Sequence, residues 1–160
     1  MKTVLLRSAA RSMCRMALVL VSLPACGAPA MAAGCVVSTS GIAFGSYDPL
    51  QAAALDSAAE LAVRCTAPTA YGVALGMGAG RYDGRLLSGG GRGAGLVYNL
   101  FVDASRTTVW GDGSASTALV SGVAPDGGVS ARHAVYGRIP ARQNLPAGTY
   151  SDSVGILVSY

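Results

Sequence analysis

The chain has 160 residues, of which 51% are hydrophobic and 12% are charged. This composition is typical of a folded domain with an apolar core and excludes an intrinsically disordered chain. The formal net charge of +4 arises at the N-terminal end, where four of the 12 basic residues lie. The other eight balance the eight acidic residues, so the charge gives no support to nucleic-acid binding.

Residues 1–32 have the composition of a secretory signal. The four basic residues precede an apolar stretch from Met16 to Ala25, and Ala30 and Ala32 fit the small positions of a signal-peptidase site. The apolar stretch is too short to span a bilayer, which needs about 20 residues. We therefore expect cleavage after Ala32 and one exported domain over residues 33–160. Lipid attachment at Cys26 is an alternative, because Leu23-Pro24-Ala25-Cys26 resembles a lipoprotein cleavage site.

Two cysteines remain in the predicted mature domain. Cys35 and Cys65 are 30 positions apart, and an even pair that enters an oxidising compartment favours a disulfide. A metal site is the alternative reading, but it lacks ligands, because His133 is the one histidine and no Cys-x-x-Cys motif is present. The sequence predicts a Cys35–Cys65 disulfide that stabilises the fold by about 3 to 4 kcal/mol.

The mature domain reads as short β-type runs separated by glycine, proline and aspartate. This pattern is typical of a β-sandwich or a barrel. The alanine-rich residues 51–59 predict a connection with at most one helical turn, and the glycine-rich residues 76–93 predict a long loop. Residues 107–110 and 118–120 predict a hairpin. The other predicted strands are 35–39, 42–47, 60–66, 71–75, 96–102, 134–139 and 150–160.

The stretch from Tyr150 to Tyr160 has the clearest alternation in the chain. One face is large and mainly apolar, whereas the other carries serine, glycine and one leucine. The residues of the large face are Tyr150, Asp152, Val154, Ile156, Val158 and Tyr160. We expect this strand to leave an unpaired edge beside an apolar groove that another element must cover.

The residues give little support to an enzyme. A serine or cysteine nucleophile needs a positioned base, and only His133 is available, with no Gly-x-Ser-x-Gly motif in the chain. No cofactor site is expected either, since no helical pattern follows the glycines at 89–93. Tyr82 and Trp110 lie near glycine-rich turns and are candidates for binding carbohydrate or an abiotic surface. Core packing is the alternative role for both.

The order of several motifs resembles the spore coat protein U domain family, which includes the archaic chaperone-usher pilins. The likeness runs from Cys35 to Tyr160, and seven motifs in order accompany a matching cysteine pair. The motifs are Cys35-Val36-Val37, Phe44-Gly45-Ser46-Tyr47-Asp48-Pro49, Val63-Arg64-Cys65-Thr66, Leu96-Val97-Tyr98-Asn99-Leu100-Phe101-Val102-Asp103, Trp110-Gly111-Asp112-Gly113, Val135-Tyr136-Gly137-Arg138-Ile139-Pro140 and Ala147-Gly148-Thr149-Tyr150-Ser151-Asp152-Ser153-Val154.

The resemblance implies an immunoglobulin-like, pilin-type sandwich that lacks its final strand. In such a family a periplasmic chaperone lends a strand, and a neighbouring pilin subunit replaces it during export through an outer-membrane usher. The protein is then exported through the periplasm to a surface fimbria that serves adhesion or biofilm formation, and it meets the membrane only through the usher unless Cys26 is lipidated. The strand-pairing role is carried over to Val154, Ile156, Val158 and Tyr160.

The sequence departs from polymerising members of the family ahead of its first mature cysteine. Cleavage after Ala32 leaves only Ala33 and Gly34 before Cys35, which is too short for a donor strand. We therefore expect a tip or terminal subunit that accepts a strand and gives none. The alternative is a self-contained secreted or coat-forming domain that binds through the glycine-rich loops between Tyr71 and Leu96.

Overall fold

The computed structural model describes residues 34–91 and 95–160, which form nine β-strands and one short 3-10 helix. The predicted signal over residues 1–32 lies outside the described residues. The elements are β1 (Cys35–Thr39), β2 (Leu55–Cys65), β3 (Thr69–Leu75), β4 (Arg85–Gly89), β5 (Gly95–Phe101), β6 (Val120–Ala124), η1 (Asp126–Gly128), β7 (Ala131–Ile139), β8 (Tyr150–Ser151) and β9 (Ile156–Ser159).

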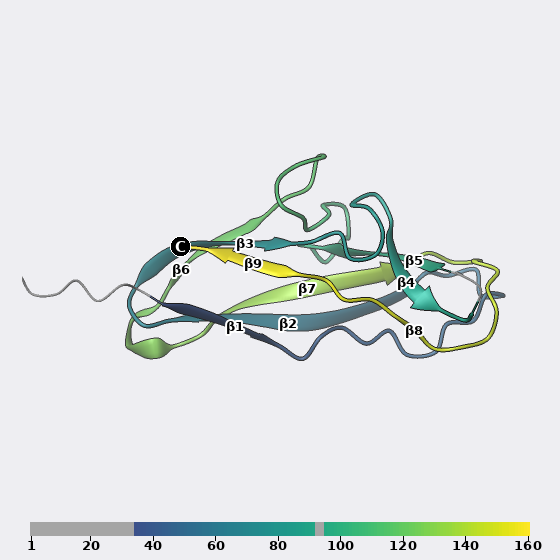
Figure 1. Ribbon diagram of the computed structural model, residues 1–160, viewed down its shortest axis with the longest axis horizontal. Helices are drawn as coiled ribbons and strands as arrows, with labels where there is room; N and C mark the ends of the chain where they lie inside the picture. The colour runs from purple at the N-terminus through teal and green to yellow at the C-terminus, as the bar shows by residue number, and fades with distance from the viewer. Residues whose placement is uncertain (1–33, 92–94) are drawn as a thin grey trace, which may run out of the picture. The chain divides into compact units, whose positions relative to one another are not determined.

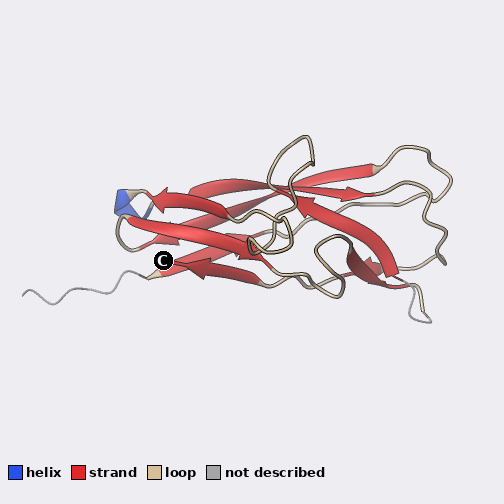
Figure 2. Cartoon of the chain, turned by 90° about the horizontal axis from the view of Figure 1, so that it is seen from above, coloured by secondary structure: helices blue, strands red, loops and turns tan. Residues whose placement is uncertain are grey.

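The strands form two sheets that face each other (Figures 1 and 2). The larger sheet has the order β1-β2-β7-β5-β4-β8, and the smaller has the order β6-β3-β9. All their strand pairs are antiparallel. The predicted all-β sandwich is confirmed.

Alternation along the strands directs one face of each sheet into a shared core. In β2, Leu61, Val63 and Cys65 are buried while the residues between them are more exposed. Val73 of β3 meets this core from the smaller sheet and is 0% exposed. The inward faces of both sheets thus bury one contiguous apolar cluster, which supplies the main favourable free energy of folding.

The alanine-rich stretch and the glycine-rich stretch hold strands that the sequence did not indicate. Strand β2 already begins at Leu55, and its Ala58 and Ala59 pair with Tyr136 and Val135 of β7. Strand β4 lies inside the predicted loop 76–93 and pairs with β5. Both predictions were wrong because cross-strand pairing outweighs the weak intrinsic preference of alanine and glycine for strands.

The predicted hairpin and the predicted long final strand also differ from the structure. Val109 bridges to Phe101, and Trp110 bridges to Ala118 in a parallel sense, so residues 107–120 form no antiparallel hairpin. Residues 150–160 are divided into β8, on the larger sheet, and β9, on the smaller one. This stretch crosses from one layer to the other, and the alternation alone cannot report such a crossing.

Candidate functional site

A cavity of about 870 Å³ lies between two segments far apart in the sequence, 39–49 and 143–156. We call this cavity the groove. Its floor is apolar and consists of core residues of the sheets. The floor residues are Leu61, Leu75, Leu87, Leu96, Tyr98, Leu100, Val135 and Ile139.

The first wall of the groove is the chain that follows β1. The pairing of β1 with β2 ends at Thr39, and residues 42–47, which the sequence predicted as a strand, have no ladder partner among the described residues. Gly41 and Gly45 have φ of 73° and 78°, a left-handed conformation that favours glycine. These two residues let the chain leave the edge of β2.

Side chains hold the first wall against the floor. Gly137 of β7 provides the space, because a Cβ there would lie 2.5 Å from Cδ1 of Ile42 and 2.7 Å from Cζ of Phe44. The Phe44 ring also meets the Tyr98 ring edge-on, with centroids 5.9 Å apart. Ile42 and Phe44 thus pack onto the larger sheet while the backbone that carries them stays unpaired.

Hydrogen bonds fix the first wall to the remainder of the fold. The Ser57 hydroxyl donates to the carbonyl of Ala43 at 2.6 Å. The Tyr47 hydroxyl donates to the carbonyl of Pro140 at 2.9 Å and accepts from the backbone N–H of Gln143 at 2.7 Å. The wall is therefore held in place by side chains, and among the backbone groups of residues 42–47 these bonds use only the carbonyl of Ala43.

The second wall contains the residues predicted to pair with a strand. Val154 and Ile156 line the groove, and Val158 packs against the core. In the ladder between β3 and β9, Ile156 lies opposite Leu75 and Val158 opposite Val73, so both point inward. Tyr160 is 60% exposed and does not line the groove.

Strand β9 uses only one of its two edges within the part of the chain that the structure describes. It pairs with β3, and its other edge borders the groove. The groove therefore has unpaired backbone on both sides, from residues 42–47 and from β9. An extended segment placed between them could make main-chain hydrogen bonds to each wall and bury its alternate side chains on the apolar floor.

A buried arginine organises the end of the fold next to the second wall. The side chain of Arg85 is 0% exposed, and burial lowers the pKa of its guanidinium. The guanidinium donates to the carbonyls of Gly76 and Trp110 and to Oδ1 of Asn99 at 2.6 to 3.0 Å. No pattern in the sequence indicates this role, since Arg85 lies within the predicted loop.

Trp110 is a core residue and cannot bind a surface. It is 0% exposed, and its Nε1 donates to the carbonyl of Val73 at 2.9 Å. Its proposed binding role is therefore wrong, because a neighbouring glycine-rich turn does not bring the ring to the surface. Tyr82 is half-buried and lies beside Arg85, whose guanidinium carbon is 5.6 Å from the Tyr82 ring centroid.

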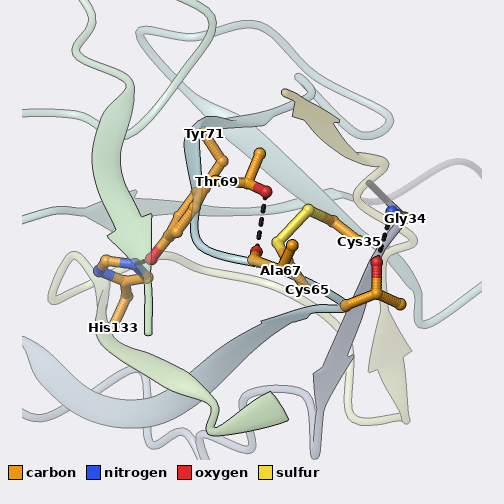
Figure 3. The surroundings of a disulfide bond; sticks show 8 residues. Gly34, Cys35, Cys65, Ala67, Thr69, Tyr71 and His133 are labelled. Atoms are coloured by element: carbon orange, nitrogen blue, oxygen red, sulfur yellow. Dashed lines mark hydrogen bonds between the residues drawn. A yellow bond between two sulfur atoms is a disulfide. The ribbon is translucent and has the colours of Figure 1, made fainter. Parts of the chain in front are cut away.

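The predicted disulfide between Cys35 and Cys65 is present and joins paired positions of β1 and β2 (Figure 3). It secures the strand that leads into the first wall. His133 lies near it and contacts the Tyr71 hydroxyl through Nε2 at 2.7 Å. Burial lowers the pKa of His133, which fits a packing role between the sheets.

Residues 34–91 and 95–160 hold no cluster of three or more metal-ligating side chains. No helix among them is long and apolar enough to cross a bilayer. The groove is the feature that most needs a functional explanation.

Comparisons with known proteins place this geometry in a family. The chain matches the Spore Coat Protein U domain over residues 17–157. It is 30% identical over 129 residues to Protein U of Myxococcus xanthus, and this match covers 73% of the chain and 70% of the relative.

A solved structure has a similar fold. It is the crystal structure of the CsuC-CsuE chaperone-tip adhesion subunit pre-assembly complex from archaic chaperone-usher Csu pili of Acinetobacter baumannii, with a TM-score of 0.57 and 22% identity. The match covers 80% of this chain and 40% of the other, so this chain spans about two fifths of that chain's length. The fold is thus pilin-like, and the chain belongs to the spore coat protein U domain family.

Proposed function

We propose that this protein is a structural subunit of a surface fimbria that is completed by a β-strand from another protein. The observation that carries the proposal is the groove, which has an apolar floor and unpaired backbone along both walls. An uncovered apolar trough between two open strand edges favours aggregation in a free protein. A strand donated by another protein would cover the apolar floor and pair with the open edges at the same time.

The partners follow from the pathway that the family resemblance implies. A periplasmic chaperone fills the groove first, and a strand of a neighbouring subunit replaces it at an outer-membrane usher. Support for a chaperone partner comes from the similar solved structure, which is a complex of a chaperone with a tip subunit. The exported subunit then serves adhesion or biofilm formation at the cell surface and has no catalytic role.

The groove can be tested with two adjacent residues of β9. Ile156 lines the groove, whereas Leu157 points away from it and is 69% exposed. Ile156→Asp would leave a carboxylate buried under the incoming strand, so we expect at least a hundredfold loss of chaperone binding, equivalent to about 3 kcal/mol or more. Leu157→Asp should change binding by less than threefold.

Co-purification of the subunit with a co-expressed periplasmic chaperone of the archaic chaperone-usher class measures the effect. The two variants are matched in chemistry and adjacent in the strand, but Ile156 faces inward, so circular dichroism of both variants should show the same fold before their binding is compared. Equal binding by wild type and Ile156→Asp would contradict the proposed groove.

We further propose a terminal place in the fibre. Between the predicted cleavage site at Ala32 and Cys35 only two residues remain, and they could not fill the groove of a neighbour. Sequencing the N-terminus of the protein purified from the periplasm should find Ala33 as the first residue. A start ten or more residues earlier, with alternating apolar residues, would contradict the terminal role.

A coat-forming domain is the second candidate, and the family description and the match to Protein U favour it. In that case the domain would cover its own groove and bind through the loops between Tyr71 and Leu96. Expression without any chaperone separates the two functions. A stable, soluble monomer would support the coat-forming domain, and loss to aggregation or proteolysis would support the pilus subunit.

A further inference from the structure

The groove contains one charged side chain among the described residues that line it, that of Asp152. Asp152 lies between β8 and β9 and is half-buried. Its neighbours along the wall that also point inward are Tyr150 and Val154. A strand in this groove would therefore pass apolar positions and one carboxylate.

The carboxylate of Asp152 has three partners. Its Oδ1 accepts from the backbone N–H groups of Ala79 and Ser153 at 3.0 and 2.8 Å. Its Oδ2 accepts from the hydroxyl of Tyr98 at 2.7 Å. A carboxylate offers about four acceptor positions, so Oδ2 retains one position that these groups leave free.

Asp152 lines the groove and two other sides of its carboxylate are covered, so we assign the free acceptor position to the groove side. Gly78 closes one side: a Cβ on this residue, which has φ of 63°, would lie 2.0 Å from Oδ2 of Asp152. Tyr98 closes the floor side. Water reaches the remaining side only while the groove is empty.

An inserted strand would place one residue directly next to this carboxylate. Residues opposite each other on neighbouring strands point to the same face, so the residue opposite Asp152 would point to the floor. There it would meet the rings of Phe44 and Tyr98, which lie edge to face. An apolar residue at this position would remove the water and return no hydrogen bond.

A neutral hydrogen-bond donor suits the site better than a cation does. The charge of Asp152 already acts on the guanidinium of Arg85, whose pKa it raises against the larger effect of burial. A lysine or arginine of the inserted strand would be a second cation close to Arg85, and the filled groove would keep it away from water. A hydroxyl group can satisfy Oδ2 without adding charge.

We propose that Asp152 selects the strand that fills the groove, by requiring a threonine or serine at one inward position of a subunit-derived strand whose other inward positions are apolar. This inference rests on the proposed function and refines it. The position of the hydroxyl residue in the strand also fixes the register, since a shift by two residues would bury Asp152 under an apolar side chain.

Synthetic peptides can test the selection. The reference peptide has valine at four alternating inward positions, and the other peptides carry threonine or lysine at one of these positions. The full chain is expressed together with a periplasmic chaperone, and the subunit is purified from the periplasm as their complex, from which the peptides displace the chaperone. We expect threonine at one position to bind about tenfold tighter than valine, and threonine at the other three to bind more weakly than valine. Competition of a fluorescent peptide measures the ratios.

Variants separate selection from a general structural role. Asp152→Asn removes the charge at constant size. Its amide oxygen would keep the two backbone N–H groups that now donate to Oδ1, so its NH2 group would replace Oδ2 and donate to the threonine hydroxyl. This neutral bond has about half the free energy of a charge-assisted one, so the tenfold ratio should fall to about threefold. Tyr98→Phe frees a second acceptor position on Oδ2 and should keep or increase the ratio. A loosened fold would weaken the threonine and valine peptides equally and leave the ratio unchanged.

Binding of the peptides with valine preferred at every position overturns the selection and leaves the strand-accepting groove standing. An unchanged ratio in Asp152→Asn, or a lysine peptide that binds more tightly than the threonine peptide, also overturns it. Failure of every peptide to bind overturns the proposed function and this inference together.

Discussion

Replacing Arg85 by methionine is expected to lower the free energy of unfolding by about 3 kcal/mol or more. Methionine fills much of the same space, but it leaves the carbonyls of Gly76 and Trp110 without their donor. The amide oxygen of Asn99 loses one of its two donors and keeps the backbone N–H of Leu100. Each buried acceptor that loses its partner costs about 1 to 3 kcal/mol. Urea unfolding followed by tryptophan fluorescence measures the change.

Two further variants define the origin of this loss. Arg85→Lys retains the charge but not the planar fork that reaches three acceptors, so it should recover only part of the stability. Arg81→Met is the matched control, because the Arg81 side chain is 84% exposed and should change the stability by less than about 0.5 kcal/mol. Equal stability of Arg85→Met and wild type would mean that the buried hydrogen bonds contribute nothing net.

Removal of the disulfide is expected to cost about 3 to 4 kcal/mol, because it frees a loop of 30 residues in the unfolded chain. The effect should extend to function, since β1 leads directly into the first wall of the groove. The double variant Cys35→Ala/Cys65→Ala should therefore bind the chaperone more weakly than wild type, even at temperatures where it remains folded.

Reduction provides the control for this prediction. Dithiothreitol should destabilise the wild-type protein by about as much as the double substitution does, and it should have no effect on the double variant. A double variant that unfolds at the wild-type urea concentration would show that the ladder between β1 and β2 needs no covalent support.

The sequence predicted the features that depend on local pattern. The cysteine pair, the inward face of β2 and the inward positions Val154 and Ile156 follow from alternation and from residue type, and the structure has each of them in a matching place. Asp152 was visible on the same face, and its polar character among apolar neighbours was the available signal for a special role.

The features that the sequence did not predict depend on contacts between distant segments. The first wall leaves the sheet because Gly137, more than ninety positions later, makes room for Ile42 and Phe44. The burial of Arg85 depends on carbonyl groups from three other parts of the chain. Periodicity describes one segment at a time, so it cannot reveal a side chain that is needed by another segment.

The two walls of the groove are far apart along the chain, and this separation makes recognition of the groove dependent on complete folding of the domain. Tyr47 on one wall and Pro140 beside the other are joined by a hydrogen bond across 93 positions. Residues of both walls pack against the core that the two sheets enclose. In the proposed pathway, a protein that recognises the finished groove therefore also checks that the whole domain has folded, and misfolded copies would be left out of the fibre without any separate sensor.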